Sequence, residues 1–138
     1  MGAPFFFRRP VRFDEVDVAG FVYFPRVIAL AHEAIERLLA ASMLDYAALI
    51  IGRRIGLPCV HVEADFAAPL RFGDELEVSL SVTSFGESSV TFAIDVARAD
   101  GIACARLKYV TACVDLDGPH KRDLLPQLRA AFEPHARG

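Results

Sequence analysis

The fold of this 138-residue chain is decided by one stretch, Val27-Ile28-Ala29-Leu30-Ala31-His32-Glu33-Ala34-Ile35-Glu36-Arg37-Leu38-Leu39-Ala40-Ala41. Its apolar residues recur at the spacing of an α-helix, and further alanines and leucines widen the apolar stripe well beyond one face. Pro25 stands just before the stretch, and proline is well tolerated in the first turn of a helix. Because so little of this helix is polar, we expect another layer of structure to enclose it.

Beyond Gly56 the period of the apolar residues changes from helical to two. Leu76–Val82 and Val90–Val96 place apolar side chains at every second position, which is typical of half-buried strands. Short connections at Phe85–Ser88 and Ala99–Gly101 separate consecutive strands, and Asp-Gly is a common hairpin turn. These features predict antiparallel strands that form the enclosing layer.

The expected order of elements is one strand, the long helix and four further strands. Strands are expected at 8–13, 58–66, 76–82, 90–96 and 102–115, with shorter helices near 44–51 and 123–132. Since short turns join the four late strands, we expect them to be antiparallel neighbours. The prediction is an α+β chain in which a curved antiparallel sheet wraps around one helix, with residues 1–138 forming a single domain.

Composition narrows the class of protein. The formal net charge of −3 gives no reason to expect nucleic-acid binding, and the apolar runs are too short to span a bilayer. The opening apolar stretch is followed by its charges, the reverse of a signal peptide, so we expect a cytoplasmic protein. The hydrophobic content of 54% is high for one small domain and indicates burial between subunits.

The cysteines and histidines give no sign of a metal or cofactor. Cys59, Cys104 and Cys113 are odd in number and widely spaced, which argues against a disulfide framework or a zinc site. We expect all three to be buried, reduced thiols. The four histidines lack metal-binding spacing, and the sequence contains no phosphate loop, dinucleotide fingerprint or serine-hydrolase elbow.

Two segments resemble a known family. Residues 11–25 read Val-Arg-Phe-Asp-Glu-Val-Asp-Val-Ala-Gly-Phe-Val-Tyr-Phe-Pro, and residues 66–78 read Phe-Ala-Ala-Pro-Leu-Arg-Phe-Gly-Asp-Glu-Leu-Glu-Val. With the order of elements, they resemble the hotdog-fold thioesterases, specifically the 4-hydroxybenzoyl-CoA thioesterase family, from about residue 8 to residue 130. The resemblance implies a five-stranded antiparallel sheet around the helix. It also implies hydrolysis of an acyl-CoA to a free acid and CoA without a cofactor, because CoA is part of the substrate.

The resemblance also implies subunit contacts and leaves the acyl group open. Members of the family place active sites at the boundary of a homodimer, and pairs of dimers often form homotetramers. The family commonly has Asn-Tyr where this chain has Arg26-Val27, close to the expected acyl site. Aromatic, short-chain and medium-chain acyl groups therefore all remain open.

The family assigns the catalytic carboxylate to the position of Asp17. A carboxylate beside a thioester either attacks it directly or deprotonates water, and both routes remain open. The backbone N–H of Phe24, at the start of the helix, is expected to bind the carbonyl oxygen, since Pro25 has no N–H. Gly20 is expected to let the loop turn and the substrate approach. Considered apart from the segment 11–25, Asp17 would be interpreted as a loop residue that makes Asx-type hydrogen bonds.

The remaining candidates concern binding. Tyr23, Val27, His61 and Phe66 are expected to contact the acyl group, and Arg98, Lys121 and Arg122 to bind the phosphates of CoA. Another branch of hotdog thioesterases uses a carboxylate on the central helix. The alternatives to Asp17 are Glu33, Glu36 and, on a strand, Glu63.

Three other functions are compatible with the predicted fold. One is a thioesterase acting on an acyl-carrier protein, which a basic surface would attract. A second is a non-catalytic hotdog domain that binds acyl-CoA or serves as an assembly partner. The third, a hydratase or dehydratase, requires a histidine with a nearby acid in another motif, and no such pair is visible.

Overall fold

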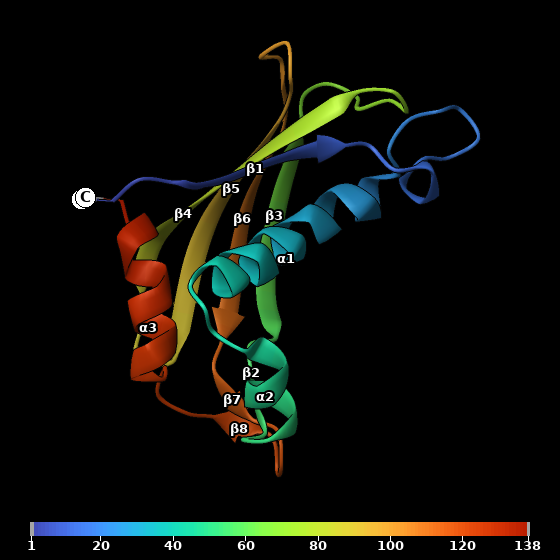
Figure 1. Cartoon of the computed structure of the whole chain (residues 1–138). Helices are drawn as coiled ribbons and strands as arrows, with labels where there is room; N and C mark the ends of the chain where they lie inside the picture. The colour runs from blue at the N-terminus through green and yellow to red at the C-terminus, as the bar shows by residue number, and fades with distance from the viewer. Residues whose placement is uncertain (1, 138) are drawn as a thin grey trace.

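The computed structural model describes residues 2–137 and shows a five-stranded antiparallel sheet curved around helix α1, Phe24–Ala41 (Figure 1). The strands run in the order β1-β4-β5-β6-β3. They are β1 (Phe5–Pro10), β4 (Glu75–Phe85), β5 (Ser89–Arg98), β6 (Ala103–Ala112) and β3 (Cys59–Phe66). This architecture confirms the predicted α+β class and the sheet wrapped around one helix.

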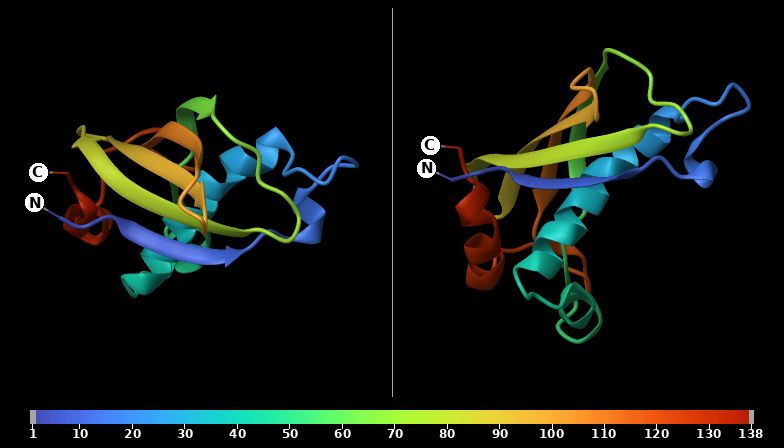
Figure 2. Two further views of the ribbon diagram at one scale, coloured as in Figure 1. Left: turned by 90° about the horizontal axis from the view of Figure 1, so that it is seen from above. Right: turned by 45° about the horizontal axis from the view of Figure 1, so that its top comes forward.

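Smaller elements close the two ends of this layer. They are η1 (Phe13–Glu15), α2 (Tyr46–Ile51), α3 (Pro126–Phe132), η2 (Glu133–His135) and a small sheet of β2 (Ile55–Gly56), β7 (Val114–Asp115) and β8 (His120–Lys121). Helix α3 covers one end of the large sheet, and both chain ends lie beside it (Figure 2). The N–H of Gly2 donates to the carbonyl of Ala136 at 2.9 Å. No helix among residues 2–137 is long and apolar enough to cross a membrane.

The core lies between α1 and the concave face of the sheet. Ala31, Ala34 and Leu38 of α1 are fully buried, and the small alanines let the helix lie close to the strands. Across the sheet, Phe92 packs edge-to-face on Phe132 of α3 with ring centroids 5.1 Å apart. Fully burying a side chain of this kind contributes about 1.5–3 kcal/mol. The enclosure expected from the wide apolar stripe of the helix is therefore present.

The first strand was predicted three residues too late. It spans Phe5–Pro10 instead of 8–13, because Pro10 has no N–H to continue the ladder and η1 follows. Three consecutive phenylalanines show no alternation, so the pattern hid the true start. In the observed strand the side chain of Arg9 faces the core, and Arg9 is 7% exposed.

The position of the strand Cys59–Phe66 was also predicted wrongly. β3 does not neighbour β4 but pairs with β6 at the far edge, since residues 67–74 cross the end of the sheet instead of making a tight turn. The predicted strand 102–115 ends at Ala112, and β7 joins the small sheet. Cys59 is exposed on the edge strand, contrary to prediction, whereas Cys104 and Cys113 are buried free thiols as expected.

Candidate active site

Asp17 lies in a tight loop between η1 and α1, which protrudes from the body of the molecule (Figure 2). Val16 and Val22 form a bridge across its base, and the N–H of Asp17 donates to the carbonyl of Phe21 at 2.9 Å. Gly20 has φ of +84° with open space around it, a conformation that a residue with Cβ adopts only under strain. The turn therefore favours glycine, as expected, and the close approach of a substrate at Gly20 stays a prediction.

The two carboxylate oxygens of Asp17 have different surroundings. Oδ1 accepts hydrogen bonds from the N–H groups of Ala19 at 2.9 Å and Phe21 at 3.4 Å. These are the Asx-type bonds expected of a loop aspartate. Oδ2 receives no hydrogen bond from any residue between 2 and 137, and the side chain is exposed. The loop thus orients the carboxylate while leaving one oxygen available for chemistry.

The first turn of α1 offers an unused backbone donor. Tyr23 is the N-cap; its N–H donates to the carbonyl of Glu15 at 2.9 Å, and its carbonyl accepts from Arg26 at 2.8 Å. Within the described part of the chain, no acceptor is bonded to the N–H of Phe24. The first N–H groups of a helix carry a partial positive charge, so this donor suits a developing oxyanion.

A pocket of about 360 Å³ lies where the start of α1 meets the end of β3. Its volume is within the range of small-molecule sites. It is lined by Val22, Phe24, Val27, Phe66, Ala67, Ala68, Pro69, Leu70, Cys104 and Ala105. Three residues predicted from the sequence, Phe24, Val27 and Phe66, therefore line one pocket of apolar residues. Phe24 and Phe66 stack edge-to-face across it, with centroids 6.4 Å apart.

Tyr23 and Asp17 lie outside the lining of this pocket. Tyr23 contacts Phe24 edge-to-face at 5.4 Å and is half exposed. The Asp17 loop joins the pocket through backbone contacts, because Val22 donates to the carbonyl of Leu70 at 2.8 Å and Phe72 donates to that of Gly20 at 3.0 Å. The loop is thus built onto the pocket wall.

Sequence reasoning missed the small residues of the wall. The register shifts between Val96 and Ala97, which leaves Cys104 as an extra residue in β6 and re-aims it toward the pocket. The carbonyl of Cys104 accepts from Ala67 at 2.8 Å and from Ala68 at 3.3 Å. The available signal was that Cys104 and Ala105 are consecutive apolar residues ahead of the alternation of Arg106, Leu107 and Lys108.

Cys104 is not a suitable nucleophile, although it lines the pocket. Burial raises the pKa of its thiol, so the thiol stays protonated at neutral pH. Its sulfur lies 3.4 Å from the carbonyl of Ile102 and is not paired with an imidazole. Cys104 therefore contributes shape, and the carboxylate of the loop is the better candidate for the chemistry.

The other carboxylates and His61 lie elsewhere. Both oxygens of Glu33 are held by Arg9 at 2.9 Å, and Glu36 lies 2.6 Å from the ring of His32. His61 alternates with Val62 and Phe66, so it faces the opposite side of β3, 3.0 Å from Glu63. Its contact with the acyl group stays a prediction.

The three cations predicted for CoA are not gathered within one chain. Arg98 lies at the pocket end of the sheet, where it pairs with Asp100 at 3.4 Å and approaches the carbonyl of Pro69 at 3.5 Å. Lys121 and Arg122 lie at the opposite end, on and after β8, and Arg122 is 3.5 Å from Asp115. Their roles in binding phosphate stay predictions.

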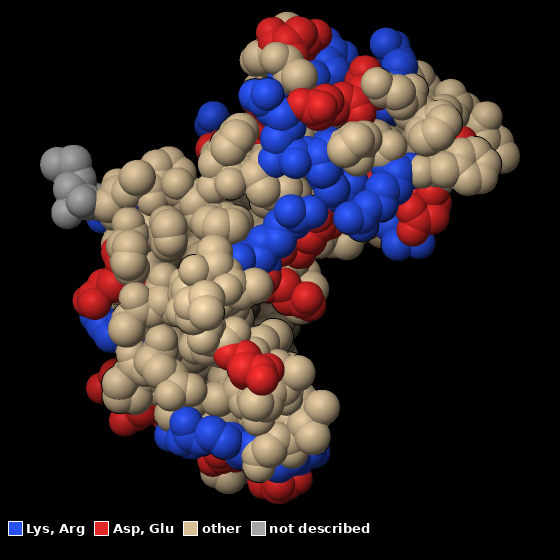
Figure 3. Space-filling model, in the orientation of Figure 1, with Lys and Arg blue, Asp and Glu red and all other residues tan. Residues whose placement is uncertain are grey.

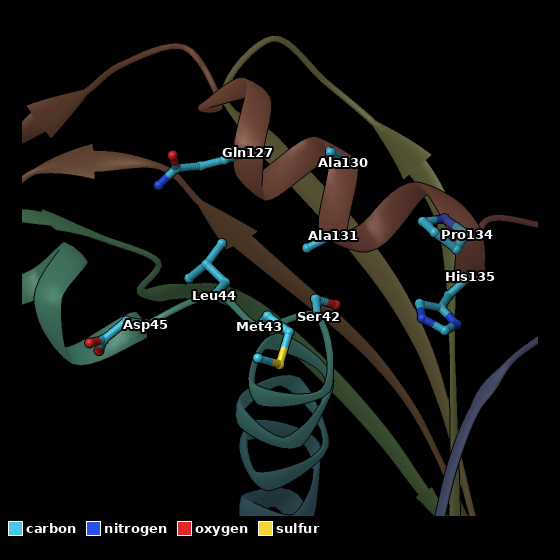
Figure 4. A pocket seen from close by; sticks show the side chains of 9 residues that line it. All are labelled: Ser42, Met43, Leu44, Asp45, Gln127, Ala130, Ala131, Pro134 and His135. Atoms are coloured by element: carbon cyan, nitrogen blue, oxygen red, sulfur yellow. The ribbon is translucent and has the colours of Figure 1, made fainter.

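A larger hollow of about 630 Å³ lies at the other end of α1, against α3 (Figure 4). Two of its polar side chains serve local structure. Ser42 donates to the carbonyl of Leu38 at 2.9 Å, and Asp45 accepts from the N–H of Ala48 at 3.0 Å as a helix cap. The hollow contains none of the candidate residues, so the smaller pocket is the better site. Across residues 2–137, no group of three or more histidine, cysteine or acidic side chains is placed to hold a metal ion.

This site and fold define a class of protein. Residues 11–132 match the thioesterase-like superfamily, and the chain belongs to it. The predicted hotdog fold and the predicted thioester hydrolase are both confirmed.

Particular relatives share nearly the whole chain. A 1,4-dihydroxy-2-naphthoyl-CoA hydrolase from Nostoc punctiforme is 32% identical over 96% of this chain and 89% of its own. The enzyme of the same name from Trichodesmium erythraeum is 30% identical over 91% of this chain and 92% of its own. The crystal structure of a 1,4-dihydroxy-2-naphthoyl-CoA thioesterase from Synechocystis covers 94% of this chain and 96% of its own, with a TM-score of 0.87 and 29% identity.

Proposed function

We propose that this chain hydrolyses the CoA thioester of an apolar aromatic acid, as a thioesterase of the 4-hydroxybenzoyl-CoA type. The first substrate to test is 1,4-dihydroxy-2-naphthoyl-CoA, which is named for relatives that match most of this chain. The observation that carries the proposal is the pocket in which Phe24 and Phe66 stack, beside the loop that presents Asp17. An aromatic-lined pocket favours a flat acyl group over an extended chain.

In the proposed reaction, Oδ2 of Asp17 acts first. It either attacks the thioester carbon, forming an anhydride that water then hydrolyses, or takes a proton from the water that attacks. In both routes the C–S bond breaks and CoA leaves as a thiolate. The thiolate takes a proton from solvent after direct attack, or the proton that Asp17 took from the water in the other route, and the acid is released. The N–H of Phe24 stabilises the oxyanion, and removing one such donor from a hydrolase typically costs about 10²–10³ in rate. We propose that no metal or cofactor takes part.

We further propose that two chains pair through β3. This strand has a free edge, and Val60, Val62 and Phe66 are 54%, 38% and 51% exposed on it. Exposed apolar edge strands invite pairing with another chain. An antiparallel two-fold pairing would bring the start of the partner's β3 to the end of this one, beside the pocket.

The same pairing offers a role for the distant cations. Lys121 and Arg122 lie at the small sheet of β2, β7 and β8. Because β2 directly precedes β3 in the chain, these cations lie near the start of β3. In the antiparallel dimer, the partner subunit's Lys121 and the partner subunit's Arg122 would approach this chain's pocket, on the side of Arg98. The CoA phosphates would then bind between subunits. Pairs of such dimers would give a tetramer.

The test is thiol release from a panel of acyl-CoAs by wild type and Asp17→Asn. This variant removes the charge and keeps the shape, so its far-ultraviolet spectrum and Tm should match wild type. We expect wild type to prefer aromatic acyl groups and the variant to lose at least about 10³-fold in kcat. Equal thiol release by both would contradict the role of Asp17. If wild type releases no thiol, the same acyl groups on a carrier protein distinguish a carrier-protein thioesterase from a binding domain.

A further inference from the structure

A buried ion-pair network joins the first strand, the Asp17 loop and the helix. The guanidinium of Arg9 donates two hydrogen bonds to Glu15, at 2.8 and 2.7 Å, and two to Glu33, both at 2.9 Å. Arg9 and Glu15 are each 7% exposed. Figure 3 shows basic and acidic side chains interleaved on this face, over β1 and α1. The Nη1 group also donates to the carbonyl of Pro10 at 2.9 Å, so all five N–H donors of the Arg9 guanidinium are used.

The arm of the network that leads to Glu33 ends on the body of the helix. Arg37 donates to Glu33 at 3.0 Å and stacks over the ring of Phe7 at 4.2 Å. These contacts join β1 to the middle of α1. None of them reaches the loop that carries Asp17.

The arm that leads to Glu15 holds the loop at both of its ends. The carboxylate of Glu15 accepts the N–H of Arg12 at 2.8 Å, and its backbone carbonyl accepts the N–H of Tyr23 at 2.9 Å. Asp17 follows Glu15 by two residues, and Phe24 directly follows Tyr23. The position of Glu15 therefore determines where the carboxylate of the loop stands relative to the first amide of α1.

We infer that Glu15, held by Arg9, is a positioning residue that keeps Asp17 in register with the start of α1 for thioester hydrolysis. The inference rests on the proposed function, in which Asp17 reacts and the Phe24 amide binds the carbonyl oxygen. Glu15 does not line the acyl pocket and acts only through the loop. An apolar pair of similar volume often stabilises a core as well as a buried ion pair does, so geometry is the distinctive contribution of the network.

The experiment compares Glu15→Gln with the matched control Glu33→Gln. Both remove one carboxylate charge that is bonded to Arg9, at the buried Glu15 or at the partly buried Glu33, so both should lower Tm. With 1,4-dihydroxy-2-naphthoyl-CoA as the probe, and benzoyl-CoA as a second, we expect Glu15→Gln to lower kcat by about 10²-fold, the cost of a small misplacement at a reacting centre. Its KM should change by less than about threefold, because the acyl pocket is untouched, and Glu33→Gln should keep kcat within about threefold.

Two further variants separate position from stability. In Arg9→Met/Glu15→Leu the buried charges are replaced by apolar side chains, so Tm should recover while kcat stays low. Glu15→Asp keeps the charge but shortens the side chain, so it too should lower kcat. Recovery of kcat together with Tm would show that Glu15 only stabilises the fold and would overturn the inference. If Glu15→Gln does not fold, kcat and Tm of these two variants still test the inference.

Amide hydrogen exchange gives a readout that does not depend on activity. Exchange in residues 16–23 should be faster in Glu15→Gln than in Glu33→Gln, and equal exchange would overturn the inference. Asp17→Asn is measured in the same assay. If it keeps wild-type kcat, the proposed function fails and the inference falls with it. If it is inactive while both glutamine variants lose kcat equally, only the positioning role is overturned.

Discussion

The two edges of the large sheet are built differently. β1 has six residues, ends at Pro10, and carries Arg8, which pairs with Glu75 and Glu77 of the neighbouring strand. β3 has eight residues without proline, and its exposed residues include Val60, Val62 and Phe66. β3 also carries exposed His61, Glu63 and Asp65, so the two edges differ in proline and length and not in charge. Proline and short length limit pairing at an edge, whereas a longer strand without proline leaves its backbone groups available. We call the β1 edge the closed edge and the β3 edge the open edge, and it is at the open edge that we propose a second chain pairs.

The two edges also contribute differently to the candidate site. The closed edge holds Arg9, whose network fixes the Asp17 loop from behind. The open edge ends at Phe66, which lines the candidate pocket. The candidate site thus lies between the ion-pair network of one edge and the edge at which we propose that a second subunit pairs.

The largest effect is expected from a charge placed on the open edge. Val62→Lys would set two like charges close together in an antiparallel β3 pair, and such a juxtaposition costs several kcal/mol. We expect the dimer to dissociate, with a dissociation constant raised by about 10²-fold or more, and activity to fall with it. Analytical ultracentrifugation measures the change. Phe6→Lys, an exposed position on β1, is the matched control and should leave the oligomeric state unchanged.

An intermediate effect on stability is expected when low pH protonates the carboxylates bonded to Arg9 on the closed edge. Burial is the largest single influence on the pKa of Glu15 and of Glu33, and it opposes ionisation. The hydrogen bonds and positive charge of Arg9, together with Arg12 at Glu15 and Arg37 at Glu33, outweigh burial and hold the pKa of both below the ordinary 4.5. A lowered folded pKa stabilises the protein above pH 4.5, and this contribution is lost as the pH falls through the folded values. Each unit of lowering is worth about 1.4 kcal/mol.

Denaturant unfolding between pH 7 and pH 3 measures this dependence. The free energy of unfolding of wild type should fall on acidification, and that of Arg9→Met/Glu15→Leu should fall less, because Glu15 is absent and Glu33 has lost Arg9. If the two proteins show the same slope with pH, the network does not govern acid stability.

The smallest effect is expected at the pocket wall. Phe66→Ala removes the edge-to-face contact with Phe24, and such aromatic pairs are worth about 0.5–1.5 kcal/mol. We expect kcat/KM for an aromatic acyl-CoA to fall about tenfold, with little change in Tm because Phe66 is 51% exposed. Phe72→Ala, which is 57% exposed and does not line the pocket, should keep kcat/KM near the wild-type value. Equal losses in the two variants would contradict this pocket as the acyl site.

Local sequence patterns predicted the elements whose structure depends on residues close together in the chain. The apolar stripe of α1 and the alternation in β4 and β5 are short-range signals, and all three elements formed where they were expected. The Asp17 and Gly20 loop was likewise visible, because an Asx turn and a left-handed glycine depend on a few consecutive residues. Their roles in catalysis stay predictions.

Contacts between distant segments were beyond those patterns. The register of β1 was missed because Phe5, Phe6 and Phe7 do not alternate, and with it the burial of Arg9 was missed. Cys104 reached the pocket wall through a bulge opposite Val96 and Ala97, which depends on how two strands pair. A strand sequence shows which residues share a face but not which strand lies beside it.

The sequence by itself determined α1, the strands β4 and β5 with the turn between them, and the loop that presents Asp17, since each depends on residues close together in the chain. Only the tertiary structure decided that β3 lies at the free edge, that Arg9 joins Glu15 to Glu33, and that Phe24 and Phe66 share a pocket. The physical reason is distance along the chain: Glu33 lies 24 residues from Arg9, and β6 follows β3 only after two other strands. Burial of the apolar helix brings these segments together, and the candidate site arises where they meet.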